Sequence, residues 1–95
     1  MSVKSIFEFK FSSATRAAGL KLVESIGNDM PPLAGYLDHE VIQDCVDPGH
    51  LMIATRWNSR AQAEAVLNTY QHDPKIEQAT QLLSGAPNGF VGDVL

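Results

Sequence analysis

The sequence of 95 residues contains a single cysteine, Cys45, and few basic side chains. One thiol cannot form a disulfide within a chain, so nothing indicates an oxidising compartment. Seven lysines and arginines face eleven aspartates and glutamates, a net charge of -4. This balance excludes the clustered positive charge of a nucleic-acid-binding surface. The apolar runs are too short for a signal peptide or a membrane helix. We therefore expect a cytoplasmic protein without a nucleic-acid or membrane partner.

The residues that are present have an ordinary globular balance, with 44 % apolar and 19 % charged side chains. Such a composition excludes intrinsic disorder. The length corresponds to one small domain covering residues 1–95, and the sequence shows no internal repeat or linker.

Hydrophobic periodicity predicts the order strand, helix, strand, strand, helix pair, strand. The predicted strands cover residues 3–11, 35–46, 51–57 and 88–95. A first helix is predicted over residues 13–30, with Ser12 or Ser13 as its cap. The helix pair begins at a capping box on Ser59 and restarts at Asp73-Pro74, where aspartate caps and proline occupies the first turn.

This order predicts an α+β fold of the ferredoxin-like βαββαβ kind, a four-stranded antiparallel sheet with helices on one face. The third strand is apolar on both sides, with Leu51 and Ile53 on one and Met52 and Ala54 on the other. Helices cover only one face, so we expect a second copy to cover the other in a homodimer. The alternative is that the C-terminal helical segment folds over that face.

Three stretches carry a family resemblance: GYLDHEV (residues 35–41), IATRWNSR (residues 53–60) and YQHDPKI (residues 70–76). The second stretch contains Trp57 followed two residues later by Ser59, where the third strand meets a helix. The third stretch contains Asp73-Pro74, where the helix restarts. The chain resembles the antibiotic biosynthesis monooxygenase superfamily of dimeric α/β-barrel proteins, and the resemblance covers nearly the whole sequence.

The resemblance implies a homodimeric, cofactor-independent monooxygenase that acts on a small aromatic or quinol-type compound. Such an enzyme needs an apolar pocket, a base and a donor for the substrate anion, and no metal, flavin or haem. Two alternatives stay open: a non-enzymatic small-ligand-binding or structural dimer, and another barrel chemistry such as lactone isomerisation.

The haem-degrading members of the superfamily are a poor match. They carry an asparagine on the first strand, where this chain has Ser5, Phe7 and Phe9. They also carry a histidine ligand where this chain has Thr80, and threonine cannot hold haem iron.

His39 is the candidate base, because histidine titrates near neutral pH and this one shares a strand face with Leu37 and Val41. The alternative is a hydrogen-bonded histidine in the core or at the dimer seam. Arg56 is a candidate to steady an anionic intermediate, or else pairs with a carboxylate on a neighbouring strand.

Phe9, Trp57 and Tyr70 are candidates to wall a pocket for a flat ring, with Tyr70 as a second catalytic residue; all three could equally be plain core. Thr80 lies on the apolar face of the last helix, so it bonds to its own backbone or lines a cavity.

His50 and His72 are expected on the surface. The three histidines lack the spacing of metal ligands, so no metal site is expected.

The hairpin register depends on the length of its loop. An even loop places Val41 opposite Arg56 and Glu40 opposite Trp57. An odd loop would change these pairs and the residues that share a face, because a slip of one residue exchanges the two faces of a strand.

Overall fold

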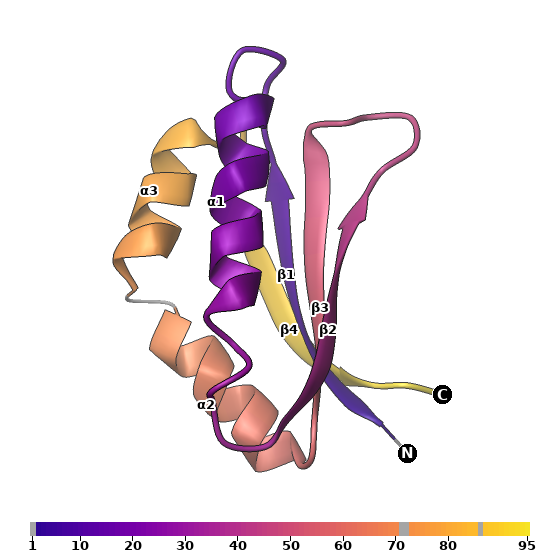
Figure 1. Cartoon of the computed structure of the whole chain (residues 1–95). Helices are drawn as coiled ribbons and strands as arrows, with labels where there is room; N and C mark the ends of the chain where they lie inside the picture. Colours follow the sequence, from indigo (N-terminus) through magenta and orange to yellow (C-terminus); the bar gives the residue numbers. More distant parts are fainter. Residues whose placement is uncertain (1, 71–72, 86) are drawn as a thin grey trace.

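The computed structural model describes residues 2–70, 73–85 and 87–95. Within these residues, four strands and three helices follow one another in the predicted order. They are β1 (Val3–Lys10), α1 (Arg16–Asn28), β2 (Tyr36–Gln43), β3 (His50–Trp57), α2 (Arg60–Tyr70), α3 (Pro74–Leu82) and β4 (Asn88–Asp93). The strands form one antiparallel sheet in the order β2-β3-β1-β4. The described helices lie on one face of this sheet, which confirms the ferredoxin-like α+β fold (Figure 1).

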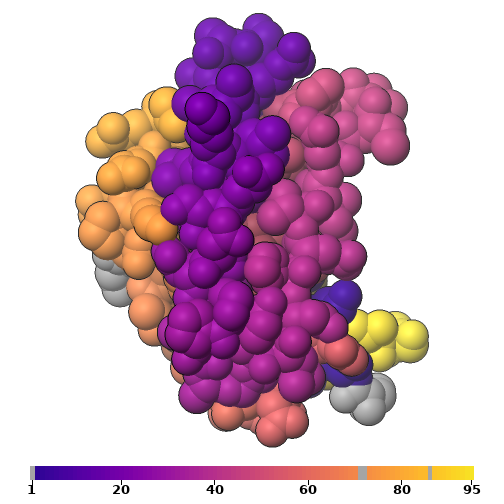
Figure 2. All heavy atoms as spheres, in the orientation of Figure 1, coloured from indigo at the N-terminus to yellow at the C-terminus, as the bar shows by residue number. Residues whose placement is uncertain are grey.

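The core lies between the helices and the inner face of the sheet, which is the face that they cover. Alternation along β1 turns Phe7 and Phe9 inward, and both are buried. The apolar stripe of α1 buries Val23 and Ile26 against them. The other members of this cluster are Phe11, Met30, Leu51, Ile53, Trp57, Ala63, Val66, Tyr70 and Ala79. In Figure 2, α1 runs along the front of the molecule between α3 and the β2–β3 hairpin.

Helix α1 is shorter than the predicted span of residues 13–30. Its N-cap is Thr15, whose hydroxyl makes no capping bond and instead donates to the carbonyl of Leu82, 2.8 Å away. The prediction of Ser12 or Ser13 as the cap is therefore wrong. The residues before the helix form a turn, in which the amide of Arg16 donates to the carbonyl of Ser12.

Strand β2 ends three residues earlier than predicted, because Asp44 builds a loop. Its carboxylate accepts the backbone amides of Val46 and Asp47, at 2.7 and 3.2 Å. The strand pairing resumes with Gln43 opposite Leu51. The connection is thus the odd one, and the even-loop register is wrong: Val41 lies opposite Ile53 and Glu40 opposite Ala54.

The start of β2 carries a bulge. Tyr36 pairs with Trp57 and Asp38 pairs with Arg56, so Leu37 is the extra residue and is half-exposed. Gly35, predicted as strand, precedes the bulge at a φ of +85°, a conformation that favours glycine. A Cβ there would also overlap the Gln62 side chain.

The helix pair begins at both predicted starts, although the capping box at Ser59 is only half formed, since Gln62 Oε1 is buried without a partner among the described residues. Ser59 Oγ accepts the amide of Gln62 at 3.3 Å. Asp73 Oδ1 accepts the amide of Lys75 at 2.8 Å, with Pro74 in the first turn of α3. None of the described helices has both the length and the apolar character needed to cross a membrane.

The outer face of the sheet, opposite the helices, is uncovered in the single chain. The register places Ile6, Ile42, Met52, Ala54 and Phe90 on it. Ile42 is 44 % exposed and Phe90 is 52 % exposed. Helix α3 packs on the other side, beside α1, so the alternative in which it folds over this face is wrong (Figure 1).

Candidate functional site

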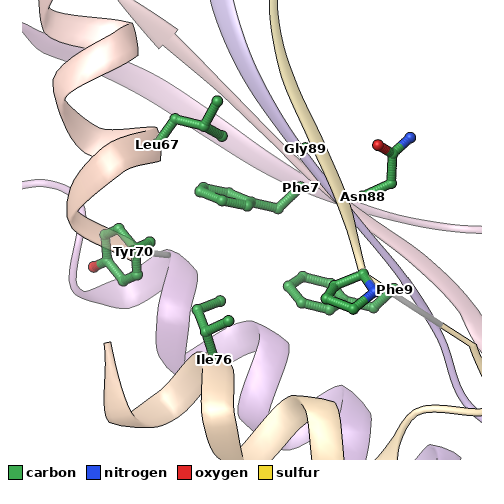
Figure 3. Close-up of a pocket in the computed structure, with 8 residues that line it drawn as sticks. Phe7, Phe9, Leu67, Tyr70, Ile76, Asn88 and Gly89 are labelled. Atoms are coloured by element: carbon green, nitrogen blue, oxygen red, sulfur yellow. The ribbon is translucent and has the colours of Figure 1, made fainter. Parts of the chain in front are cut away.

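A cavity of about 150 Å³ lies between the inner face of the sheet and helices α2 and α3 (Figure 3). Its lining residues are Phe7, Phe9, Leu67, Tyr70, Ile76, Pro87, Asn88 and Gly89. Concave, mostly apolar spaces of this kind are the usual place for a small-molecule site. We therefore take this cavity as the candidate site.

A wider hollow of about 370 Å³ lies on the outer face and is a weaker candidate. It is lined by Ser2, Lys4, Asp38, His39, Glu40, Arg56 and Val94. Its charged groups already pair with one another, Arg56 with Asp38 and Lys4 with Glu40. Groups that are paired in this way offer little to a ligand.

The aromatic walls of the cavity hold each other in place. The ring of Phe7 meets the ring of Tyr70 edge to face, with centroids 5.9 Å apart and planes at 65°. Such contacts favour a fixed arrangement of the two rings. Tyr70 is the last residue of α2, where the predicted helical stripe brings it to the sheet, and it is buried.

The hydroxyl of Tyr70 does not point at the other aromatic walls. In Figure 3 it lies on the side of the ring away from Phe7 and Phe9. Burial, helped by the negative charges of Asp29 and Asp73, raises the pKa of Tyr70 to about 12. At neutral pH this group is therefore a neutral phenol, able to donate a hydrogen bond but unsuited to remove a proton.

His39 lies on the inner face of β2, beneath α1, and is not among the residues that line the cavity. Its Nδ1 is 2.6 Å from the hydroxyl of Tyr36. Its Nε2 is packed against Gly27, where a methyl group added to the glycine would approach to 3.1 Å. His39 is thus hydrogen-bonded within the protein, as the alternative to a catalytic base predicted. The structure does not bring His39 and Tyr70 together on the cavity.

Arg56 projects from the outer face, so the sheet separates it from the cavity. Its Nη2 and Nε donate to Oδ2 of Asp38, at 2.6 and 3.1 Å. The predicted alternative of a carboxylate partner on a neighbouring strand is confirmed. Arg56 lies outside the pocket because alternation along β3 puts it on the face opposite Ile53 and Trp57, and the odd hairpin loop separates it from His39.

Trp57 and Thr80 also lie outside the cavity. Trp57 is buried, and its Nε1 donates to Oγ of Ser5 at 2.9 Å. It borders a separate groove of about 190 Å³ beside Val66. The exposed Thr80 donates to the carbonyl of Ile76 at 2.8 Å, while its neighbour Ala79 takes the buried position. Phe9 and Tyr70 are the predicted site residues that do line the cavity.

Sequence reasoning did not name six of the lining residues as site residues: Phe7, Leu67, Ile76, Pro87, Asn88 and Gly89. Leu67 and Ile76 lie at helical spacing from the apolar residues Ala63 and Ala79, so their inward direction could be read from the period. Gly89 contributes by lacking a side chain, and periodicity gives no signal for such a position.

His50 is more constrained than a solvated surface residue. Its Nδ1 lies 3.0 Å from Asp44 Oδ2, and its Nε2 lies 3.4 Å from Glu8 Oε2. The hydrogen bonds to Asp44 and Glu8 raise the pKa of His50, and the bond from His50 contributes most to lowering the pKa of Asp44 to about 2. His50 is thus partly exposed, in keeping with a surface position, but its ring is held between two carboxylates.

The described part of the chain contains no cluster of side chains that could bind a metal ion. Among residues 2–70, 73–85 and 87–95, no group of three or more His, Cys, Asp or Glu side chains is placed to hold an ion. His72, expected on the surface, lies outside the described residues.

Several solved structures have the same arrangement of strands and helices, and some of them carry the name that the sequence resemblance suggested. One described as an antibiotic biosynthesis monooxygenase shares 16 % identity, covers 98 % of both chains and has a TM-score of 0.81. SnoaB from Streptomyces nogalater, described as a cofactor-independent oxygenase, shares 11 % identity over 98 % of this chain and 92 % of its own, with a TM-score of 0.79. Rv0793 from Mycobacterium tuberculosis shares 19 % identity over 100 % and 96 %, with a TM-score of 0.77.

The chain therefore has the fold of structures named antibiotic biosynthesis monooxygenase, and the resemblance seen in the sequence is confirmed at the level of the fold. No protein-family model matches the chain, and no curated protein matches it.

Proposed function

We propose that this protein is a cofactor-independent monooxygenase of a small aromatic or quinol-type compound. The observation that carries the proposal is the cavity walled by Phe7, Phe9 and Tyr70, set beneath the helices of a fold shared with a cofactor-independent oxygenase. Apolar walls favour the binding of a flat ring. Because they exclude water, they also protect a carbanion formed on the substrate from being protonated before it reacts with oxygen.

The proposed reaction converts a ring carbon ortho or para to a phenolic hydroxyl, which is a CH₂ group in the keto tautomer, into a carbonyl. The substrate loses a proton, and its electron-rich anion then reduces oxygen. One oxygen atom enters the substrate as the carbonyl and the other leaves as water, so that CH₂ and O₂ become C=O and H₂O. The substrate supplies all four electrons, and this is why the proposal needs no cofactor.

Tyr70 enters the proposal as a wall and a neutral hydrogen-bond donor. Its raised pKa keeps the proton on the hydroxyl at neutral pH. His39 remains the predicted base, although it lies beneath α1 beside Tyr36. The proton would then have to reach it from the cavity by a relay, so the role of His39 depends on one more step than the role of Tyr70.

The test is oxygen consumption by the purified protein with a panel of quinols and anthrone-type compounds. We expect turnover with at least one member, undiminished by a chelator, and one ¹⁸O atom from ¹⁸O₂ in a rapidly quenched product. His39→Gln and Tyr70→Phe should each slow that turnover. Absence of oxygen uptake across the panel, or a dependence on added flavin or metal, would contradict the proposal.

A second candidate is a small-ligand-binding protein without turnover. It is favoured by the distance in the fold between the two predicted catalytic residues, because His39 is under α1 while Tyr70 is on the cavity. Calorimetric binding of a ring compound, with no oxygen uptake for any member of the panel, would select this candidate.

We also propose that the protein is a cytoplasmic homodimer, joined through the outer face of the sheet. Ile42 and Phe90 leave apolar surface on this face, and the pairs Lys4–Glu40 and Arg56–Asp38 lie beside it. A lasting dimer would bury roughly 800 Å² or more on each partner.

A further inference from the structure

Gly89 sets the size of the cavity from the side of the sheet. It lies on the inner face of β4, directly opposite Phe7 of β1. A methyl group at this position would come within 3.1 Å of Leu67 Cδ1 and 3.3 Å of the backbone carbonyl oxygen of Ile6. The carbonyl belongs to the sheet and cannot yield, so any side chain here would push on Leu67 and fill the space between them.

The walls formed by β1 and the end of α2 leave little room for expansion, whereas the β4 side, where Asn88 and Gly89 are exposed, opens to solvent. Phe7, Phe9 and Tyr70 are 7 %, 1 % and 5 % exposed, and all three belong to the close-packed core. Interiors at this density accommodate an extra ring only by displacing neighbours. An apolar cavity of about 150 Å³, the volume found here, holds a benzene-sized molecule.

The polarity of the walls restricts the ligand further. Among the residues that the structure describes, the lining side chains are apolar or neutral, with Asn88 at the rim and its amide turned away from Phe7 (Figure 3). Burying an unpaired charge among such groups is strongly unfavourable. The cavity therefore favours a neutral ring whose polar substituent stays at the rim.

We propose that the cavity accepts neutral compounds with one aromatic ring, of the phenol type, and excludes fused two-ring and three-ring compounds, with Gly89 and Leu67 as the residues that set this limit. The identification of such a compound as substrate rests on the proposed function. The size limit itself concerns binding and stands or falls without turnover.

The first test is anaerobic calorimetry with phenol, 2-naphthol and 2-hydroxyanthracene, which carry the same hydroxyl on one, two and three rings. We expect measurable binding of phenol and at least a tenfold weaker affinity for 2-naphthol, against the trend of their hydrophobicity. Equal or tighter binding of 2-naphthol, or no binding of phenol at concentrations up to its solubility limit, would overturn the proposal.

Variants then test whether Leu67 and Gly89 set the size limit of the ligand. Leu67→Ala should admit 2-naphthol with at least tenfold higher affinity than the wild type. Val66→Ala is the matched control, because Val66 neighbours Leu67 in α2 but borders the groove beside Trp57. A gain in the control as large as that in Leu67→Ala would overturn the assignment.

Filling the cavity provides the converse test. Gly89→Ala should weaken phenol binding at least tenfold, whereas Gly92→Ala, where a methyl group meets only Phe90 at 3.4 Å, should leave it unchanged. If Gly89→Ala does not fold, Leu67→Phe fills the same space from the helix. Unchanged phenol binding in the folded filling variant would overturn the proposal.

The binding assays also separate this inference from the proposed function. Selective binding of phenol without oxygen uptake from any single-ring quinol would refute the monooxygenase and leave the size limit intact. Turnover of three-ring compounds alone would support the monooxygenase and refute the size limit.

Discussion

Two small polar side chains, Ser5 and Thr55, are fully buried at neighbouring positions of the inner face. Each satisfies a specific partner: Ser5 Oγ accepts from Trp57 Nε1 at 2.9 Å, and Thr55 Oγ1 contacts the sulfur of Met30 at 2.9 Å. A buried polar atom is tolerated when it has such a partner.

Replacing Ser5 by alanine should leave the indole N–H of Trp57 buried without an acceptor. We expect a loss of about 1–3 kcal/mol in the free energy of unfolding, measured by urea denaturation. Ser12→Ala, at an exposed turn position, is the control and should stay within about 0.5 kcal/mol of the wild type. A loss at Ser5 no greater than that of the control would show that the bond contributes nothing.

The arrangement of His50 between two carboxylates makes the stability of the fold depend on pH. Both ring nitrogens face oxygen acceptors, Asp44 on one side and Glu8 on the other, and only the imidazolium can donate from both. The folded pKa of His50 is raised above 6.5, so its contribution is fully present below 6.5 and is lost as the pH rises through the folded value. The folded pKa of Asp44 is lowered from 3.8 to about 2, so its contribution is present above 3.8 and is lost as the pH falls through about 2.

His50→Gln should therefore destabilise the protein most between pH 3.8 and 6.5, where both groups are charged. The difference from the wild type should shrink at alkaline pH and again in strong acid. Chemical denaturation across pH 3 to 9 gives the two curves. Parallel curves over that whole range would contradict this account of His50.

Site residues were predicted correctly where the direction of the side chain follows from local periodicity. They were predicted wrongly where the position depends on how two strands pair. Phe9 alternates along β1 and Tyr70 follows the stripe of α2, and both reach the cavity. His39 and Arg56 would share a face in the even-loop register, which the loop after Gln43 changes, and no local pattern reveals that Asp44 will extend this loop. Thr80 was assigned to an inward face that Ala79 occupies instead.

At the scale of elements, the best predictions were those with a chemical stop or start signal. The Asp73-Pro74 restart was placed correctly because an acceptor side chain and a fixed φ act on the same turn. The start of α1 was misplaced because Ser12, Ser13 and Thr15 are all possible caps in sequence, and the choice depends on a distant carbonyl, that of Leu82.

Helix α3 should depend strongly on its N-cap, since Ala79 is its one fully buried residue in the described structure. Asp73→Ala removes the acceptor for the amide of Lys75 and should lower the free energy of unfolding by about 1 kcal/mol. Hydrogen exchange should show the largest loss of protection in α3. Asp73→Asn keeps an acceptor oxygen and should lose less; equal losses in the two variants would indicate that the cap bond is not the cause.

A second contact holds α3 in place. Nζ of Lys75 lies within bonding distance of Asp29 at the end of α1, and it donates to Ser25 Oγ at 2.7 Å. Both groups are partly exposed, so the ion pair itself contributes little to stability. Its effect is positional: it fixes the first turn of α3, and with it Ile76, over the cavity.

At the scale of the whole molecule, the two faces of the sheet differ in how far they are covered. The inner face is buried by three helices of the chain itself, within the described residues. The outer face keeps Ile6, Ile42, Met52 and Phe90 together, with Phe90 52 % exposed. Exposed apolar surface of this extent on one side of a small protein is typical of an interface.

The dimer proposal predicts a sharp response to a charge at the centre of this surface. Phe90→Glu would bury an unpaired carboxylate between two sheets, so we expect sedimentation of the wild type as a dimer at micromolar concentration and of the variant as a monomer. Glu77→Gln, on the solvent side of α3, is a control that should remain dimeric. Circular dichroism should show a folded variant, because Phe90 points away from the core and its loss leaves the inner packing intact. A folded wild type of about 10.3 kDa in solution would refute the dimer. It would leave the cavity intact, because the cavity lies across the sheet from the outer face.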